Sequence, residues 1–381
     1  MKIPRLKTGL LTLAIAMLAG CGGGGDGVPQ EEGVTALKVF GDSLADVGTF
    51  GGVRATVQGN GQLMYPEHVA AAYGLSTHCN FFLLAGASIG VNPKAGCTNY
   101  AIGGGVINHA NPNDPRSIQL QLATPNGFKA GDLLLVDGGG NDAAALVSAY
   151  LAVPKDKGAS YAALLATLLP KAQVDTAMAG GSATIAGIGM PYMQALAVKF
   201  RTGIQLHALD KGATRIALLN MPGITNTPRF QTVLDGIAAA NGGGTAGATA
   251  RAQAEGLFKG WMEAFNAELA KQFSGDARVL VIDFYTAFNQ QVASPAQYGL
   301  SNVKTPACPI TGVGSDGLPT YSFPTCTATA LSANPPAGVS GGADWWKTYA
   351  FSDGFHPTPY GHQLTAQLIT KALSDKGWLK K

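Results

Sequence analysis

The sequence predicts an α/β fold in which helices cover both faces of a mostly parallel sheet. Two observations carry this prediction: short apolar runs alternate with segments of helical spacing, and two of the runs end in glycine-rich turns. Strands separated by helices are typical of parallel sheets, because each crossover connection lays a helix on a face of the sheet. The chain has 381 residues, of which 46% are hydrophobic. This is enough for one large domain with a substantial core.

Four apolar runs are expected to form the parallel strands. They are residues 36–40, 132–136, 213–220 and 279–284. Helices are expected at 67–73, 143–151, 255–273 and 360–373, and a loop of small residues at 241–250. In parallel sheets the chemistry gathers at the carboxyl ends of the strands, which directs attention to the turns after 36–40 and 132–136.

The first residues predict export. Three basic residues precede an apolar run at 9–18 that is too short to span a bilayer, so residues 1–20 have the layout of a signal peptide. The stretch ending at Cys21 resembles the lipobox of bacterial lipoproteins, which implies an acylated Cys21, a membrane anchor and a flexible tether over 21–34. Gly22 is not the aspartate that retains lipoproteins in the inner membrane, so an outer-membrane location is expected. The alternative is ordinary cleavage and a periplasmic or secreted protein.

One domain is expected over 35–381, with insertions near 152–209 and 293–346, and it is expected to be a monomer. The net charge of the full chain is +3, but three of its 26 basic residues lie in the leader. Their removal leaves 23 basic residues against 23 acidic ones. Without a basic field, nucleic acid is excluded as a partner.

Four cysteines remain beyond Cys21, and an even number in an exported chain predicts two disulfides. Three connectivities are possible. The prediction is the local pairing, Cys79 with Cys97 and Cys308 with Cys326. A zinc site is the alternative, but no usual zinc-ligand spacing is present, so no metal and no other cofactor is expected.

Ser43 is the predicted nucleophile. It lies in Phe40-Gly41-Asp42-Ser43-Leu44, directly after the first apolar run. At a strand-to-helix turn its hydroxyl can project above the edge of the sheet, although a serine here can also be a helix N-cap. Two G-x-S-x-G matches compete, at Ser88 and Ser340. Ser340 follows no strand, and Ser88 is followed by a proline-containing stretch that starts a helix poorly.

A serine nucleophile needs a base that is oriented by an acid, and donors for the oxyanion. Asp353 stands three residues before His356, so the spacing predicts that the carboxylate holds the imidazole. His362 is a rival base, but no acid precedes it at comparable spacing. Backbone N–H groups of the glycine-rich stretch 99–105, the N–H of Ser43 and the side chain of Asn141 are the predicted oxyanion donors.

These four segments, in this order, resemble the SGNH/GDSL hydrolase family, from Phe40 to the closing helix. Residues 215–222, 265–269 and 298–308 resemble its bacterial phospholipase/lecithinase branch. The resemblance implies a three-layer α/β/α sandwich with a five-stranded, mostly parallel sheet, and a serine carboxylic-ester hydrolase, an esterase or lipase, acting on lipid or small acyl esters. It assigns Ser43, His356 and Asp353 to the triad, and Gly104 with Asn141 to the oxyanion hole.

Alternatives to this assignment remain. Gly103 is the neighbour with which Gly104 can be confused, because three glycines run together. Asp42, Asp46 and Asp142 belong to the family's blocks and are expected to hold loops rather than to react. An acyltransferase that uses the same acyl-enzyme, and a non-catalytic surface lipoprotein, are the competing functions.

Overall fold

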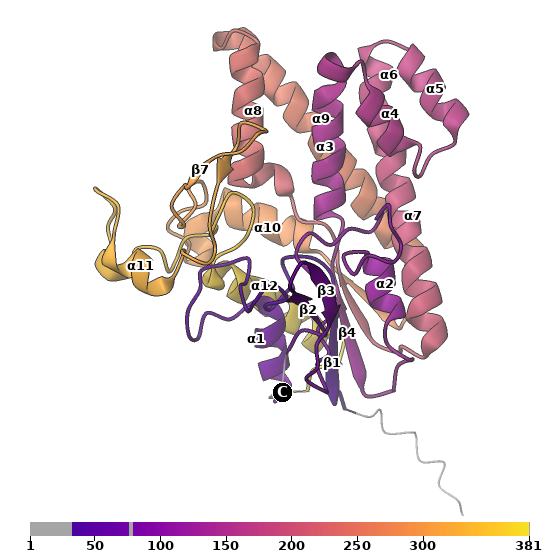
Figure 1. Cartoon of the computed structure of the whole chain (residues 1–381), viewed down its shortest axis with the longest axis vertical. Helices are drawn as coiled ribbons and strands as arrows, with labels where there is room; N and C mark the ends of the chain where they lie inside the picture. The colour runs from indigo at the N-terminus through magenta and orange to yellow at the C-terminus, as the bar shows by residue number, and fades with distance from the viewer. Residues whose placement is uncertain (1–32, 76–78, 381) are drawn as a thin grey trace, which may run out of the picture. The chain divides into compact units, whose positions relative to one another are not determined.

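The computed structural model describes residues 33–75 and 79–380 (Figure 1). The predicted signal peptide, Cys21 and nearly all of the predicted tether lie outside the described residues. From Gly33 onward the chain forms one compact unit. No helix among the described residues combines the length and the apolar character needed to cross a membrane.

The core of the unit is a parallel sheet whose four strands run in the order β1-β4-β5-β6. Their bounds are Ala36–Phe40 (β1), Asp132–Val136 (β4), Ile216–Leu219 (β5) and Val279–Ile282 (β6). Each neighbouring pair is parallel, with Ala36 opposite Asp132 and Leu134 opposite Ile216. All four strands lie where the apolar runs predicted them, and the first two have the predicted bounds.

The sheet has four strands within the described residues, and not the five that the resemblance implied. The segment after Cys97 occupies the place beside β1. Val39 N–H donates to Thr98 O (3.0 Å) and Tyr100 N–H donates to Val39 O (2.7 Å), but the pairing is a single parallel bridge at Asn99. Asn99 turns its side chain to the carbonyl of Ala45 (2.7 Å), and the chain then enters the glycine-rich stretch, so no strand continues.

Helices cover both faces, which confirms the α/β sandwich. Their bounds are α1 Tyr65–Ala72, α2 Ile118–Ala123, α3 Gly140–Asp156, α4 Ala159–Leu165, α5 Lys171–Ala179, α6 Ser182–Gly187, α7 Gly189–His207, α8 Pro228–Ala240, α9 Gly244–Gln272, α10 Phe284–Ala293, α11 Ala328–Ala333 and α12 Pro359–Asp375. Leu134 and Val136 of β4 face a core that includes α2, α3, α7 and α9. Leu133 and Leu135 face the opposite core with α1, α10 and α12.

The helix α9 is longer than the sequence predicted. The predicted loop at 241–250 is mostly helical, because α9 begins at Gly244. Its first turns are rich in alanine, the strongest helix former, but carry no apolar stripe that the periodicity could detect. Together with α3 and α8, α9 rises beyond the carboxyl end of the sheet (Figure 1).

Two short antiparallel hairpins lie outside the main sheet: β2 (Phe82–Ala85) with β3 (Ser88–Val91), and β7 (Gly312–Val313) with β8 (Pro319–Thr320). Each hairpin lies within a loop closed by a disulfide. The bridges are Cys79–Cys97 and Cys308–Cys326, the predicted local pairing, and in each the two cysteines are 18 residues apart.

Candidate active site

Ser43 lies in the turn that leaves β1 at its carboxyl end. Gly41 shapes this turn, because a Cβ there would lie 1.8 Å from Oδ1 of Asp137. Asp42 N–H donates to that same oxygen (3.0 Å), and Leu44 N–H donates to Oδ1 of Asp42 (3.0 Å). The backbone on both sides of Ser43 is therefore fixed, while the Ser43 N–H itself has no acceptor among the described residues.

His356 and Asp353 lie in the loop that precedes α12. Asp353 Oδ1 accepts the N–H groups of Phe355 (2.8 Å) and His356 (2.6 Å), so its own side chain closes the turn. The three-residue spacing is thus realised in a turn closed by the carboxylate, and not in a turn of helix. His356 Nδ1 lies 2.9 Å from Asp353 Oδ2, and His356 Nε2 lies 2.8 Å from Ser43 Oγ.

The protonation states follow from this chain of contacts. Burial alone would raise the pKa of Asp353, but the charge of His356 and the hydrogen bonds to it hold that pKa below its ordinary value. Burial alone would lower the pKa of His356, but Asp353 and, more weakly, Asp42 raise it above its ordinary value. With an ionised Asp353 accepting from Nδ1–H, the Nε2 atom is the acceptor, and the Ser43 hydroxyl donates to it.

Hydrogen bonding separates Gly104 from its glycine neighbours. Gly103 N–H donates to Asp46 Oδ2 (2.8 Å) and Gly105 N–H donates to Ile102 O (2.9 Å). Only the N–H of Gly104, of these three, has no acceptor in the part of the chain that the structure describes. This N–H is therefore the one available to an external oxyanion.

The glycine stretch is bonded to both other donor segments. Ile102 N–H donates to Gly41 O (3.2 Å), which joins the stretch to the Ser43 turn. Asn141, at the start of α3, donates one N–H of its Nδ2 to Gly105 O (2.9 Å). The second N–H of that amide is left for another acceptor. The three predicted donor segments thus meet at one end of the sheet.

Two buried residues of this region were not predicted. Tyr65 donates its hydroxyl to Asp137 Oδ2, so Asp137 joins α1, the end of β4 and the Ser43 turn. Burial and the nearby charge of Asp42 raise the pKa of Asp137 well above its ordinary value, and burial also raises that of Asp42. An acid directly after an apolar strand was the available signal for Asp137, since this is the functional end of the sheet.

The other acidic residues of the family blocks hold loops in the structure. Asp46 accepts the N–H groups of Gly48 (2.9 Å) and Thr49 (2.8 Å), besides that of Gly103. Asp142 accepts the N–H groups of Ile107 and Asn108, both at 2.9 Å, and burial raises its pKa to about 6.

The rival residues lie elsewhere. Ser88 is exposed in the β2–β3 hairpin, where its hydroxyl reaches only Ala85 O (3.5 Å), and Ser340 is exposed in a bend. His362 is fully buried in α12 beside the ring of Tyr65 (6.2 Å between centroids). Neither ring nitrogen of His362 has a hydrogen-bond partner in the described structure, and burial lowers its pKa to about 3.

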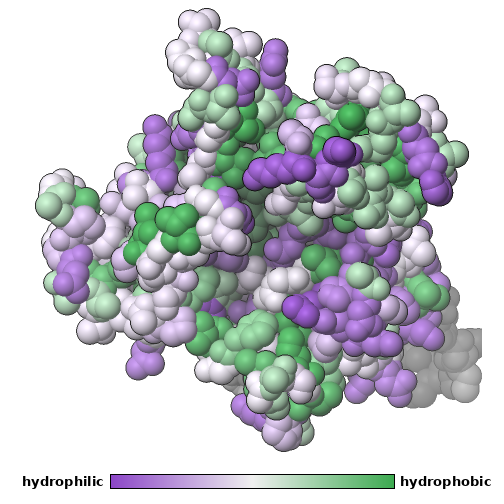
Figure 2. Space-filling model, turned by 45° about the horizontal axis from the view of Figure 1, so that its top comes forward, coloured by the Kyte–Doolittle hydropathy of each residue, from purple (hydrophilic) through white to green (hydrophobic). Residues whose placement is uncertain are grey.

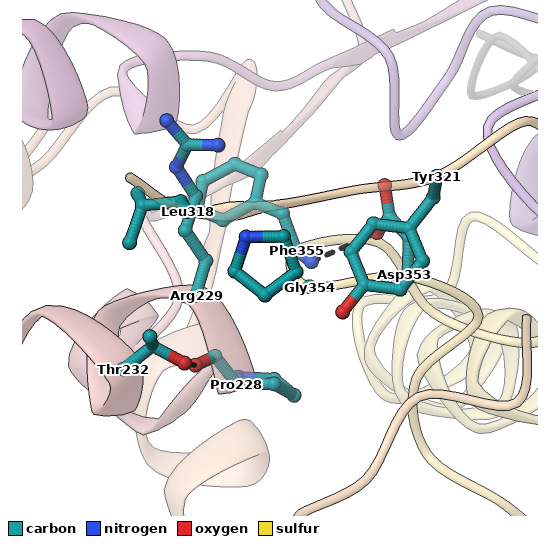
Figure 3. Close-up of a pocket in the computed structure, with 9 residues that line it drawn as sticks. Pro228, Arg229, Thr232, Leu318, Tyr321, Asp353, Gly354 and Phe355 are labelled. Atoms are coloured by element: carbon teal, nitrogen blue, oxygen red, sulfur yellow. Dashed lines mark hydrogen bonds between the residues drawn. The ribbon is translucent and has the colours of Figure 1, made fainter. Parts of the chain in front are cut away.

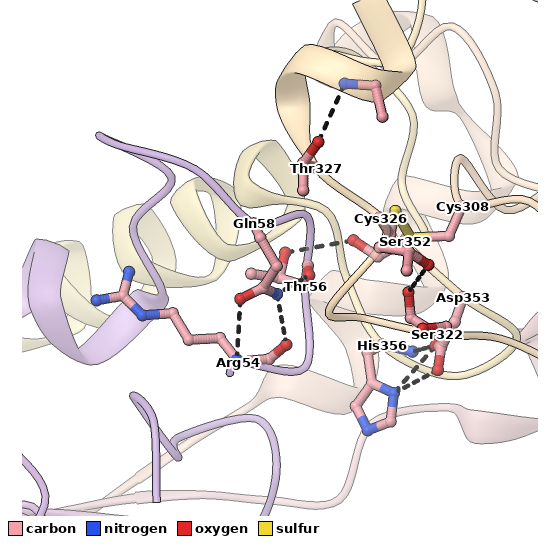
Figure 4. The surroundings of a disulfide bond; sticks show 12 residues. Arg54, Thr56, Gln58, Cys308, Ser322, Cys326, Thr327, Ser352, Asp353 and His356 are labelled. Carbon is pink, nitrogen blue, oxygen red and sulfur yellow. Dashed lines mark hydrogen bonds and ion pairs between the residues drawn. A yellow bond between two sulfur atoms is a disulfide. The ribbon is translucent and has the colours of Figure 1, made fainter. Parts of the chain in front are cut away.

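The Cys308–Cys326 bridge lies between the segment that carries His356 and the segment that follows the Ser43 turn (Figure 4). Cys308 N–H donates to Ser352 O (2.8 Å), next to Asp353, and Cys326 O accepts the N–H of Gln58 (2.8 Å), on the segment that follows the Ser43 block. Thr56 Oγ1 also donates to Pro357 O (2.9 Å). The bridge therefore connects the segment that carries the imidazole with the segment that carries the serine.

Aromatic residues of the same disulfide loop cover the acid and the imidazole. The Phe323 ring lies edge-on to His356, with the centroids 5.5 Å apart. Tyr321 lines a cavity of about 50 Å³ with Asp353 and Phe355 (Figure 3). Arg229 of α8, which pairs with Asp316 (2.7 Å) in the β7–β8 hairpin, lines the same cavity. No group of three or more metal-ligating side chains occurs among the described residues.

The chain is similar to known proteins over most of its length. The family model described as GDSL-like lipase/acylhydrolase matches residues 37–369. The chain is 26% identical to Lipase 1 of Photorhabdus luminescens over 89% of this chain and 50% of that protein. It is 25% identical to an uncharacterized protein in the trpE–trpG intergenic region of Pseudomonas putida, over 98% of this chain and 53% of that protein. The chain thus spans about half the length of these relatives. Since the family model covers most of the sequence, the chain belongs to the GDSL-like lipase/acylhydrolase family.

Proposed function

We propose that this chain is a serine carboxylic-ester hydrolase in which Ser43 is the nucleophile, His356 the general base and Asp353 the residue that orients it. The observation that carries the proposal is the continuous line of contacts from Ser43 Oγ to His356 Nε2 (2.8 Å) and from His356 Nδ1 to Asp353 (2.9 Å). Membership of a lipase/acylhydrolase family supports the reaction class.

The proposed reaction has two halves. Ser43 Oγ attacks the ester carbonyl carbon while His356 Nε2 takes the hydroxyl proton. The carbonyl oxygen becomes an oxyanion, and the C–O bond to the alcohol then breaks as His356 returns the proton to the leaving oxygen. In the second half, water gives its proton to His356 and attacks the acyl-enzyme. The proton returns to Ser43 Oγ as the carboxylic acid is released.

The oxyanion is proposed to bind the N–H of Ser43, the N–H of Gly104 and the free N–H of Asn141 Nδ2. All three segments are held by hydrogen bonds to one another, so the donors are in place before the charge develops. Preorganised donors of this kind contribute on the order of 10²–10³ in rate each.

The proposed setting is an exported lipoprotein anchored through Cys21 to the outer membrane. The two disulfides support an oxidising compartment. Replacing Cys21 by serine is expected to move the protein from the membrane fraction to the soluble fraction of cells that export it. An unchanged distribution would exclude the anchor without touching the catalytic proposal.

The catalytic proposal is tested with purified wild type, Ser43→Ala and Ser88→Ala on p-nitrophenyl butyrate. We expect Ser43→Ala to lose the activity while its circular dichroism stays that of wild type, and Ser88→Ala to retain full activity. Near wild-type activity in Ser43→Ala would refute the assignment. Product analysis with an added alcohol acceptor separates hydrolysis from acyl transfer, since a transferase would form the new ester in place of the acid.

A further inference from the structure

An apolar cleft of about 670 Å³ lies among α3, α6, α8 and α9. Its apolar walls include Tyr150 of α3, Ala186 of α6, Ile237 of α8, and Ala254 and Leu257 of α9. None of the sixteen lining residues is charged, and four of them carry a polar side-chain group, which are Tyr150, Ser182, Asn241 and Gln253. Its volume falls in the range of small-molecule sites, roughly 300–1,000 Å³. Figure 2 shows apolar surface in a hollow between two raised parts of the face that it views.

The cleft lies along three helices, α3, α8 and α9, each of which also reaches the proposed catalytic site. On α3, Tyr150 stands nine residues beyond Asn141, which is about 14 Å of helix. On α8, Ile237 stands seven residues beyond Phe230, about 10 Å of helix. Phe230 marks the site end of α8, because its ring stacks 6.3 Å from that of Phe355, the neighbour of His356.

The third helix gives the same separation. Phe265 of α9 reaches the catalytic end of the sheet, since its Cζ lies 3.3 Å from where a Cβ on Gly139 would be. Leu257 lines the cleft eight residues earlier, about 12 Å along α9. Along each of the three helices, a residue that lines the cleft thus lies about 10–14 Å of helix from a residue at the catalytic end of the sheet.

We propose that this cleft binds the distal half of a long acyl chain whose ester carbonyl lies at Ser43. The inference rests on the proposed hydrolase function and adds its substrate class, esters of long-chain fatty acids. An extended chain advances roughly 1.2 Å per bond, as three backbone bonds span about 3.3–3.6 Å. An acyl chain thus enters the cleft after about ten carbons, and chains of 14 to 18 carbons place their last methylenes there.

The apolar character of the lining residues favours an acyl chain over an anionic ligand or a protein partner. A phosphate or sulfate group would need cationic or densely polar walls, and the lining supplies neither. A protein partner would need a surface of about 800 Å² on each side, whereas the cleft is a concavity of small-molecule size. A methylene chain needs only apolar surface, and each methylene buried there is worth up to about fourfold in binding.

The test compares p-nitrophenyl butyrate with p-nitrophenyl palmitate in the same detergent. Ala254 lines the cleft from α9, and Ala252 is exposed on the same helix outside it, so Ala254→Trp and Ala252→Trp form a matched pair. We expect Ala254→Trp to lower kcat/KM for palmitate at least tenfold and to leave that for butyrate within twofold. Ala252→Trp is expected to change neither.

A second filling variant, Ala186→Phe, blocks the cleft from α6 and is expected to act as Ala254→Trp does. Unchanged palmitate hydrolysis in both filling variants, an equal loss on both esters, or a change of oligomeric state in gel filtration would each overturn the proposal. The proposal would also be overturned if kcat/KM of wild type did not increase for acyl chains longer than eight carbons. These results differ from failure of the hydrolase assignment, in which wild type cleaves neither ester.

Discussion

Removing the Cys308–Cys326 bridge is expected to reduce catalysis far more than removing Cys79–Cys97, although the two bridges close loops of the same length. The perturbation is a pair of double variants, Cys308→Ala with Cys326→Ala and Cys79→Ala with Cys97→Ala. In each bridge the cysteines are 18 residues apart. Chain entropy therefore assigns both losses the same effect on the free energy of unfolding, about 3 kcal/mol.

The effect on catalysis differs because the two loops touch different parts of the site. Cys308 N–H donates to the segment that carries the imidazole, and Cys326 O accepts from the segment that follows the serine. Phe323 of the same loop packs on His356. Misplacement of reacting groups by about 1 Å costs on the order of 10² in rate. We expect this loss in kcat for the Cys308/Cys326 variant. The Cys79–Cys97 loop bonds to supporting segments of the site: Asn80 Nδ2 donates to Asp46 (2.6 Å), and Phe81 N–H donates to Asn99 O at the start of the glycine-rich stretch (2.6 Å). Among the described residues it has no hydrogen bond to Ser43, His356 or Asp353, so we expect a loss below about tenfold there.

The assay is hydrolysis of p-nitrophenyl butyrate at a temperature well below the unfolding transition of either variant, with thermal unfolding recorded in parallel. Equal losses of kcat at equal losses of stability would refute the reasoning, because the bridge would then act through stability alone. A larger loss in the Cys79/Cys97 variant would contradict it more strongly. Reduction of wild type by dithiothreitol removes both bridges and is expected to lower kcat at least as much as the Cys308/Cys326 variant does.

Three further variants test the electrostatics and the donors. Asp353→Asn should lower kcat by about 10⁴-fold. It should also move the acid limb of the pH profile to lower pH, because Asp353 raises the pKa of His356, which must be neutral to act as a base. An acid limb at the same pH as in wild type would count against this pairing. Asn141→Ala should lower kcat by about 10²–10³-fold with little change in KM, and an effect confined to KM would remove Asn141 from the oxyanion site. His362 stays neutral in the fold down to a pKa of about 3, so protonation in the unfolded state favours unfolding as pH falls below about 6.5. His362→Phe should therefore gain stability relative to wild type by about 1.4 kcal/mol per pH unit between pH 6 and 4 in urea unfolding, and a difference independent of pH would show that His362 is not buried neutral.

Sequence reasoning placed the strands well because their signal is local. The runs at β1 and β4 are mostly apolar stretches with glycines one or two residues after them, and both bounds are as predicted. The first turns of α9 were missed for the opposite reason, since small residues carry no hydrophobic period. The fifth strand came from the resemblance, and the structure reduces it to one bridge at Asn99.

Site residues could be predicted where they follow a strand directly or lie a few residues apart in the sequence. Ser43, Asp353 and His356 meet in the structure as that reasoning expected. The choice between Gly103 and Gly104 could not be made from letters alone, because it depends on which N–H is taken by Asp46. Asp137 and Tyr65 escaped notice because their contact joins segments 72 residues apart, and no local pattern encodes such a pair.

The central claim, that Ser43 is the nucleophile, is tested most directly by labelling the full chain with a fluorophosphonate, which reacts only with an activated serine. The labelled protein is digested, and the modified peptide is identified by mass spectrometry. We expect a single phosphonylated residue, Ser43, and loss of labelling in His356→Ala, since the base activates the hydroxyl. A label on Ser88 or on any other serine, with Ser43 unmodified, would contradict it.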